Sequence, residues 1–337
     1  MKRLLQVVFF TWMVGSSYGQ DAHYSMFFNS PLNLSPGLTG VYQCNQRYHA
    51  NYKRQWHSVP VEYQSFDIGA DIKFKSDLDT TANYFSLGAL LNYDQAGDLN
   101  LSYTSFDLMG SYSLELGPGF LTPGIGLGIN FRNYDTTDAL VGEFWDGTGI
   151  NLGTQVNDPL YIGQDSRSIT FFDVGVGLNY RYLKEYRKFI DIGVSLNNIL
   201  GPSQIFASPN VINDESNLNR KINVYGMANW QLASKFDLLL NALGSFQGPY
   251  QEIVLNGQGK IYLGNENALY LGIGYRVSDA FIPMIALQFK NIYAAFSYDI
   301  NISDFDKATD GRGGPEFAVR YMICPSPFTP RKPCPIY

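Results

Sequence analysis

Much of the chain alternates strictly between apolar residues and polar or small residues. In residues 171–182, FFDVGVGLNYRY, Val176 and Leu178 belong to one set of alternate positions, or parity, and Asp173 and Asn179 belong to the other. Because side chains of a β-strand point alternately to its two faces, this stretch predicts a strand with one apolar and one polar face. Such a strand suits a soluble sheet whose apolar face is buried, or a membrane barrel whose apolar face meets lipid.

Similar alternating segments recur almost to the C-terminus, and we predict about fourteen strands. Short turn clusters such as GPG and GNEN separate most of them, which leaves no room for crossover helices and predicts an antiparallel meander. The predicted strands lie near 46–56, 62–74, 82–94, 98–115, 119–133, 168–183, 188–199, 220–233, 235–246, 250–263, 267–278, 281–289, 291–302 and 314–323.

The lengths of the connections favour a barrel. The long ones, 134–167, 200–219 and 303–313, follow the fifth, seventh and thirteenth predicted strands, whereas connections after even-numbered strands are brief. Outer-membrane barrels have this asymmetry, with long extracellular loops and short periplasmic turns. We therefore predict an all-β fold, a transmembrane antiparallel up-and-down β-barrel, with the apolar parity of each strand facing lipid.

The N-terminus resembles a secretory signal peptide. Lys2 and Arg3 precede the apolar run LLQVVFFTWMVG, and Ser17 and Gly19 occupy the small-residue positions of a cleavage site before Gln20. A buried first strand or helix is the alternative explanation for the apolar run. No cysteine follows the site, so we do not expect a lipoprotein anchor.

These features divide the chain into four parts. We expect a signal peptide at 1–19, a periplasmic or plug-like segment at 20–45, the barrel at 46–323 and a tail containing proline and cysteine at 324–337. No apolar run after residue 20 approaches the roughly 20 residues of a membrane helix. An outer-membrane location in contact with lipid is therefore expected.

Composition narrows the class of partner. The chain has 24 Tyr, 23 Phe and 33 Gly with only 16% charged residues, which suits strands with aromatic girdles. It carries 24 Lys and Arg against 30 Asp and Glu. This acidic balance, without a visible basic patch, argues against a nucleic-acid partner.

The chain has three cysteines, so at most one internal pair can form. Cys324 and Cys334 bracket a proline-rich tail and could close a small disulfide loop, while free or otherwise paired thiols are the alternative. Cys44 is the third cysteine.

Motifs for catalysis or metal binding are weak. The three histidines, His23, His49 and His57, lie near the N-terminus without a matching ligand cluster, so we expect no metal and no cofactor. An outer-membrane lipase would need a serine beside a histidine base, and His49 could reach a serine on the last strands, but no motif selects one. We expect no enzyme activity.

Charged residues on the lumen parity are the most informative polar groups. They could form a self-neutralising network that only stabilises the barrel, or a polar cradle for an inserted peptide. The residues predicted to face inward are Asp67, Asp71, Asp173, Asp191, Arg132, Arg181, Arg276, Glu252 and Lys260. Those we select as candidate partner-binding groups are Asp173, Arg181, Asp191, Arg276, Arg132 and Lys260.

Several ordered motifs resemble the PorP/SprF family of Bacteroidetes outer-membrane proteins. The predicted mature start, QDAHYSMFFNSPLNLSPGLTGVY, is followed by NYKRQW and EYQSFDIGAD. Later come LLNYDQAGDLNLSY, FDVGVGLNYRY, IDIGVSLNNIL, LYLGIGYR and AAFSYDINIS. The resemblance spans nearly the whole chain after the signal peptide.

The resemblance implies a role in type IX secretion or gliding motility. Some relatives associate with the periplasmic ring or peptidoglycan-binding components of the machinery, and others hold secreted adhesins at the cell surface through their C-terminal domains. We therefore expect a barrel that docks the C-terminal domain of a secreted protein or serves as a machinery subunit. A passive porin or a transporter of small hydrophobic substrates is the alternative, since either needs a similar barrel.

Overall fold

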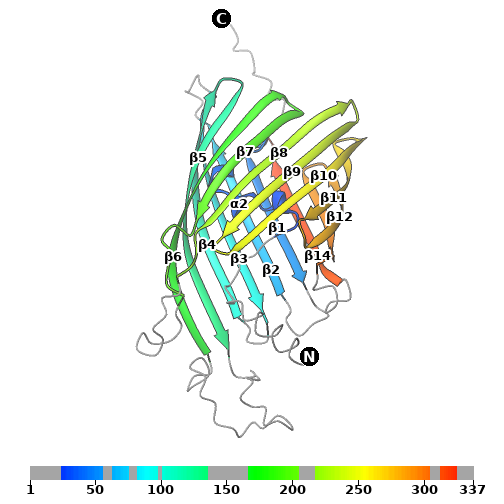
Figure 1. Cartoon of the computed structure of the whole chain (residues 1–337). Coiled ribbons are helices and arrows are strands. Elements are labelled where there is room, and N and C mark those ends of the chain that lie inside the picture. Colours follow the sequence, from blue (N-terminus) through cyan, green and yellow to red (C-terminus); the bar gives the residue numbers. More distant parts are fainter. Residues whose placement is uncertain are drawn as a thin grey trace, which may run out of the picture.

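Fourteen antiparallel strands close into a barrel in the computed structural model, in which every strand pairs with its neighbours along the chain and β14 pairs with β1 (Figure 1). The structure describes residues 24–55, 63–75, 82–97, 101–135, 166–204, 217–303 and 312–324. The strands are β1 (Gln46–Gln55), β2 (Tyr63–Phe74), β3 (Tyr84–Ala96), β4 (Leu101–Leu116), β5 (Gly119–Asp135), β6 (Ser166–Glu185), β7 (Lys188–Asn197), β8 (Lys221–Ala233), β9 (Phe236–Gln247), β10 (Tyr250–Gly264), β11 (Asn267–Arg276), β12 (Ala280–Phe289), β13 (Ile292–Asn301) and β14 (Arg312–Ile323).

The predicted fold class is confirmed, because each predicted strand corresponds to an observed one with ends shifted by a few residues. The two ends of the barrel also differ as predicted. Strands β4 and β5, β6 and β7, β8 and β9, β10 and β11, and β12 and β13 are joined by two-residue turns, whereas β5 and β6 are separated by residues 136–165. We call the end that carries Gln46 and Ile323 the turn end, and the end that carries Gln55 and Asn301 the loop end.

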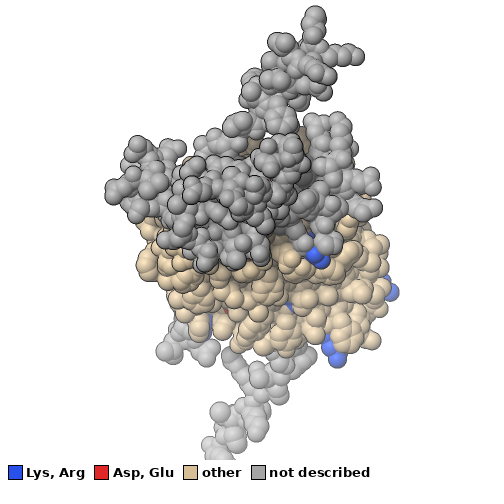
Figure 2. All heavy atoms as spheres, turned by 90° about the horizontal axis from the view of Figure 1, so that it is seen from below, with Lys and Arg blue, Asp and Glu red and all other residues tan. Residues whose placement is uncertain are grey.

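The outward face of the wall is apolar. On β6, Phe172 and Val176 are 68% and 40% exposed, whereas Asn179 on the other parity is fully buried. From below, the described atoms are almost all uncharged, with isolated Lys and Arg (Figure 2). A wall with polar groups inside and large apolar side chains outside is suited to lipid on its outer face. Among the described residues, no helix is long and apolar enough to cross a membrane.

Residues 24–45, which we call the plug, run through the lumen before β1 begins. The plug contains three short helices, η1 (Phe27–Asn29), α2 (Pro31–Leu34) and η2 (Pro36–Leu38), and Figure 1 shows α2 inside the ring of strands. Pro31 and Pro36 begin two of these helices, and the Ser35 hydroxyl accepts a hydrogen bond from Gly37 N. Proline at a first helical position and serine before it are favoured locally, which helps these short helices form.

Glycines on β5 and β6 make room for the plug. A Cβ at Gly124 would lie 2.3 Å from the Pro36 carbonyl oxygen, and one at Gly177 would lie 2.2 Å from Ser35 Oγ. Gly37 on the plug is equally constrained, because its own Cβ would lie 3.0 Å from the Gly177 backbone. The plug backbone therefore lies directly against the inner wall, where no side chain fits between them.

The disulfide joins Cys44 to Cys324, so Cys324 does not close the loop with Cys334 that the sequence left open as one alternative. Cys44 precedes β1 and Cys324 follows β14, and the closed barrel makes these two strands neighbours, with their Cα atoms 4.2 Å apart. Cys334 lies outside the described residues. The bond links the last residues of the plug, at the turn end, to the seam, which is the pair of strands β1 and β14 that closes the barrel.

Candidate functional site

The plug begins at the loop end, in a buried cluster of charges. The Ser25 hydroxyl donates to Asp299 Oδ1 at 2.7 Å, and it accepts from Lys53 Nζ at 2.9 Å and from Arg276 Nη2 at 2.5 Å. The backbone amide of Ser25 donates to Glu316 Oε2 at 2.7 Å. Lys53 Nζ also lies 3.2 Å from Asp299 Oδ2. Since these side chains are nearly inaccessible to water, their charges are stabilised mainly by one another and by the plug.

Halfway through the lumen, Asp67 on β2 receives the next part of the plug. Its Oδ2 accepts hydrogen bonds from Ser30 Oγ at 2.8 Å and Asn33 Nδ2 at 3.2 Å, and its Oδ1 accepts from Asn51 Nδ2 at 2.8 Å. Asp67 thus binds two plug residues and one wall residue. It is fully buried, so substitution without replacement of these bonds would leave polar groups unsatisfied.

Near the turn end, Asp71 and Arg47 hold the plug before it leaves the lumen. Gly40 N donates to Asp71 Oδ2 at 2.7 Å, and Arg47 forms a bidentate pair with the same carboxylate at 2.9 and 2.7 Å. Arg47 Nη2 also donates to the Leu38 carbonyl at 3.1 Å. The Tyr42 hydroxyl donates to the Asp71 carbonyl at 2.7 Å, and burial raises the pKa of this phenol, which keeps it protonated as a donor.

Two of the selected residues, Arg181 and Asp191, form a bidentate ion pair between neighbouring strands. Arg181 Nε and Nη2 lie 2.8 and 2.7 Å from the two Asp191 carboxylate oxygens, and Nη2 also donates to the plug carbonyl of Val41 at 3.3 Å. Arg276, also selected from sequence, belongs to the Ser25 cluster and contacts Glu252, Asp279 and Asp299. These three residues therefore contact the chain itself.

The other three selected residues lie apart from one another. Asp173 on β6 accepts a hydrogen bond from Asn198 N at 2.9 Å. Arg132 on β5 lies over the Tyr103 ring near the loop end, and Lys260 on β10 lies near the turn end. The structure thus does not bring the six selected residues together into one site.

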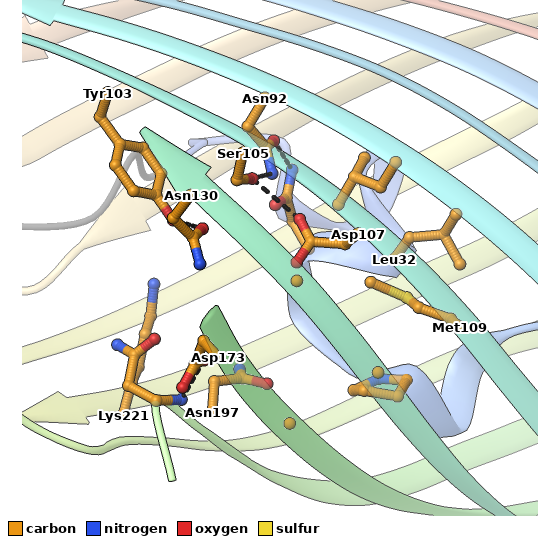
Figure 3. Close-up of a pocket in the computed structure, with 17 residues that line it drawn as sticks. Leu32, Asn92, Tyr103, Ser105, Asp107, Met109, Asn130, Asp173, Asn197 and Lys221 are labelled. Carbon is orange, nitrogen blue, oxygen red and sulfur yellow. Dashed lines mark hydrogen bonds between the residues drawn. The ribbon is translucent and has the colours of Figure 1, made fainter. Parts of the chain in front are cut away.

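A polar pocket remains open beside the plug, toward the loop end. It is a cavity of about 100 Å³ between the plug and strands β3 to β8, and Leu32 and Met109 form part of its apolar floor (Figure 3). Its polar lining includes Asn92, Tyr103, Asp107, Asn130, Asp173, Asn197 and Lys221. We call this cavity the loop-end pocket.

Glycines keep the loop-end pocket open on β5 and β6. A Cβ at Gly128 would lie 2.3 Å from Asp107 Oδ1, and one at Gly175 would lie 2.7 Å from Asn197 Oδ1. Asp107 and Asp173 come from β4 and β6, on either side of β5. The pocket therefore presents two carboxylates and several amides beside one cation, Lys221, and its carboxylates can bind basic or hydrogen-bond-donating groups.

His49, considered above as a possible catalytic base, faces the lumen beside a carboxylate. It is 3% exposed, and its Nε2 lies 3.7 Å from Asp67 Oδ1. Its direct cross-strand partners are Gly69 on β2 and Arg320 on β14, so neither partner supplies a serine nucleophile.

Several anchoring residues were not selected from the sequence. Ser25, Lys53, Asp299 and Glu316 come from the plug, the first strand and the last two strands. Lys53, Asp299 and Glu316 occupy inward-facing positions of their strands, so the alternation of apolar and polar residues could have identified them. Their convergence on Ser25 depends on barrel closure and on the path of the plug, neither of which strand periodicity specifies.

Comparison with known proteins gives a family match over most of the chain. The sequence profile described as "Type IX secretion system membrane protein PorP/SprF" matches residues 16–321. None of the curated proteins matches the chain significantly.

Three solved structures illustrate the structural similarity. The chain is 10% identical to a Pseudomonas aeruginosa FadL homologue, with a TM-score of 0.48 over 83% of this chain and 90% of that one. It is 9% identical to the CymD monoaromatic hydrocarbon channel, with a TM-score of 0.47 over 91% and 96%. It is 11% identical to the translocator domain of the Neisseria meningitidis autotransporter NalP, with a TM-score of 0.43 over 88% and 95%.

The family match runs from residue 16 to residue 321, so it includes the plug and nearly all of the barrel wall. The fold places the strands in a closed barrel with an apolar exterior and a polar interior, as an outer-membrane location requires. The chain belongs to the PorP/SprF family of type IX secretion system membrane proteins and is an outer-membrane β-barrel.

Proposed function

We propose that this barrel docks the C-terminal domain of a secreted protein at the cell surface, within the type IX secretion system. The observation that supports this proposal best is the occupied lumen. Residues 24–45 fill the space through which a passive porin would conduct, and they are bound to the wall at Asp299, Asp67, Asp71 and Arg181.

The plug also changes which groups a docked protein could reach. Arg181 and Arg276 are already bound to carboxylates and to the plug, so a partner that used them would have to displace the chain's own contacts. The loop-end pocket is open and polar, and it lies toward the end that outer-membrane barrels direct outward. We therefore place the docking contact at this pocket. Asp107 and Asp173 already accept hydrogen bonds from Ser105 and Asn198, and a carboxylate can accept further bonds, so these two groups would receive donors from the secreted protein.

The chemistry of the pocket favours a basic or donor-rich segment as the docked element. Hydrogen bonds to charged groups contribute roughly 1.5 to 3 kcal/mol each, so a few of them could retain a protein at the surface. The expected partner is a secreted protein that carries a type IX C-terminal domain.

The test is retention of surface proteins in cells that carry Asp107→Lys. This change reverses one pocket charge, and we expect the docked protein to move from the cell surface into the medium, while the barrel stays abundant and keeps its different gel mobility before and after boiling. Glu266→Lys is the matched control, because it makes the same charge change on an exposed residue in the turn between β10 and β11.

A strain that lacks the barrel should lose the same surface proteins. If that strain retains every surface protein and secretes normally, the docking function is wrong. Loss of retention in the Glu266→Lys strain, equal to that in the Asp107→Lys strain, would contradict the placement at the loop-end pocket.

A further inference from the structure

We infer that a second docking site lies inside the turn end and binds an acidic peptide segment of a periplasmic protein. The site is formed by Lys260, Tyr262, Tyr270, Tyr293 and Arg320, which we call the basic vestibule. It goes beyond surface docking, because it lies at the opposite end of the lumen and would hold a different partner.

The barrel register builds the basic vestibule from neighbouring strands. Lys260 on β10 is the direct cross-strand partner of Tyr270 on β11, and Tyr293 on β13 is the direct partner of Arg320 on β14. The rings of Tyr270 and Tyr293 meet edge to face, with centroids 5.2 Å apart. Two cations are thus placed on either side of a tyrosine pair.

Both cations lie over aromatic rings. Lys260 Nζ is 4.5 Å from the centroid of the Tyr262 ring and 5.2 Å from that of Tyr270, and Arg320 Cζ is 4.6 Å from that of Tyr293. The rings orient the two side chains and stabilise part of their charge. Lys260 lies directly across from Asp237 on β9, but that carboxylate is paired with Arg187 and accepts a hydrogen bond from the Tyr262 hydroxyl. Neither Lys260 nor Arg320 forms a salt bridge with another residue in the part of the chain that the structure describes.

Other cations near the turn end are differently placed. Arg47, Arg181 and Arg187 each form an ion pair with an aspartate at 2.6 to 2.7 Å. Arg320, in contrast, has a buried Nε that makes no hydrogen bond with any described residue. A buried donor without an acceptor is costly, and an incoming carboxylate would supply that acceptor.

The plug leaves the basic vestibule accessible from the turn end. Met26 packs in one cluster with Tyr270 and Tyr293 and closes the loop-end side of the tyrosine pair. Farther along, Val41 contacts Arg181 and Gln43 Nε2 donates to the Tyr186 carbonyl on the β6–β7 side. The plug then reaches the seam of β1 and β14, where Cys44 bonds to Cys324 and Asn45 N donates to the Ile323 carbonyl. Among the described residues, plug residues 39–45 form no hydrogen bond with strands β10 to β13.

Charge and position together indicate the occupant. Two cations beside tyrosine rings suit carboxylates, and the site faces the lumen, away from the lipid that surrounds the barrel. The turn end of an outer-membrane barrel faces the periplasm. An acidic polypeptide segment can enter from there in extended form, whereas a lipid head group would have to leave its acyl chains outside the wall.

The experiment measures peptide binding to the full-length barrel in nanodiscs of zwitterionic lipid, with fluorescein-labelled hexaglutamate as the probe. The native barrel should bind the probe in a salt-dependent manner. The double variant Lys260→Gln with Arg320→Gln should bind it at least about tenfold more weakly, because two charge-assisted contacts are lost. Each single variant should show an intermediate loss.

The matched control is Arg132→Gln, which removes a cation that also lies over a tyrosine ring but near the loop end. This variant should bind hexaglutamate as the native barrel does, and hexalysine should not bind at the vestibule. Gel mobility before and after boiling confirms that each variant is folded, and the single variants decide the question if the double variant does not fold.

Three results would overturn the inference. The first is absence of hexaglutamate binding by the native barrel, and the second is equal affinity in native and vestibule variants. The third is displacement of the probe by equimolar inorganic phosphate or by phosphatidylglycerol added to the nanodiscs, which would assign the site to a small anion or to lipid. Loss of surface proteins through Asp107→Lys is measured separately, so failure of either proposal is recognised independently.

Discussion

The two ends of the lumen have opposite electrostatic character although one continuous set of strands builds both. At the loop end, Lys53 and Arg276 are buried among Glu252, Asp299 and Glu316, and plug residue Ser25 is bound at their centre. The inward charges near the turn end include more cations than carboxylates. They are Arg47, Lys73, Arg181, Arg187, Lys260 and Arg320 with Asp71, Asp191 and Asp237.

The difference shows that a polar lumen can serve two purposes in one barrel. Where charges are paired and bound to the plug, they hold the chain's own segment in place and have little capacity left for a partner. Where cations lie on aromatic rings and form no salt bridge with a described residue, as Lys260 and Arg320 do, they can still bind an anion. Removal of a lysine at each end should therefore have very different consequences.

The largest effect is expected at the loop end, for Lys53→Met. Lys53 is 1% exposed, and its loss leaves Asp299 and Glu316 close together without its charge. Breaking a buried ion pair by removing one partner typically costs about 3 to 5 kcal/mol. Unfolding of the purified barrel in urea should show a loss of this order, and an unchanged midpoint would contradict the described cluster.

A cation on the lipid face should have the next largest effect. Val176→Arg places a charge on the exposed outer face of β6 and should cost roughly 2 to 4 kcal/mol if the site is at mid-membrane depth. Gly177→Ser is not a suitable control, because Gly177 contacts the plug. Val176→Leu keeps the surface apolar and should fold into vesicles with native yield; equal yields of the Arg and Leu variants would show that the face assignment is wrong.

A methyl group between the wall and the plug should have a smaller effect. Gly124→Ala places a Cβ 2.3 Å from the Pro36 carbonyl, so the plug or β5 must shift. Overpacking of this kind typically costs about 1 to 3 kcal/mol. Gly257→Ala is the control, because its Cβ would meet only the Leu240 side chain at 3.7 Å. Urea unfolding compares the two, and equal stability would contradict the close contact of plug and wall.

The smallest effect on stability is expected at the turn end, for Lys260→Met. Lys260 contacts two rings and lies across from Asp237, which keeps its ion pair with Arg187 when Lys260 is replaced, so its loss should cost less than about 1 kcal/mol. The comparison with Lys53→Met uses the same substitution at both ends of the lumen. If the two variants are destabilised equally under urea, the proposed difference between the ends does not exist.

Strand positions could be predicted from the sequence because the apolar and polar alternation is a local property. The inward direction of Arg181 and Asp191 followed from parity, but their direct cross-strand pairing depends on the register of β6 and β7. Pairing between Cys44 and Cys324 depends on closure of the barrel between its first and last strands. The plug could not be placed in detail, because its helices are too short for a periodic pattern and its contacts come from distant strands.

The most direct test of the plugged lumen is the conductance of the native barrel in planar bilayers. Since residues 24–45 occupy the space inside the wall, the native chain should insert without producing a steady open current. Mild urea that releases the plug before the strands unfold should produce one. A steady porin-like current from the untreated native barrel would contradict the account and would favour a passive porin.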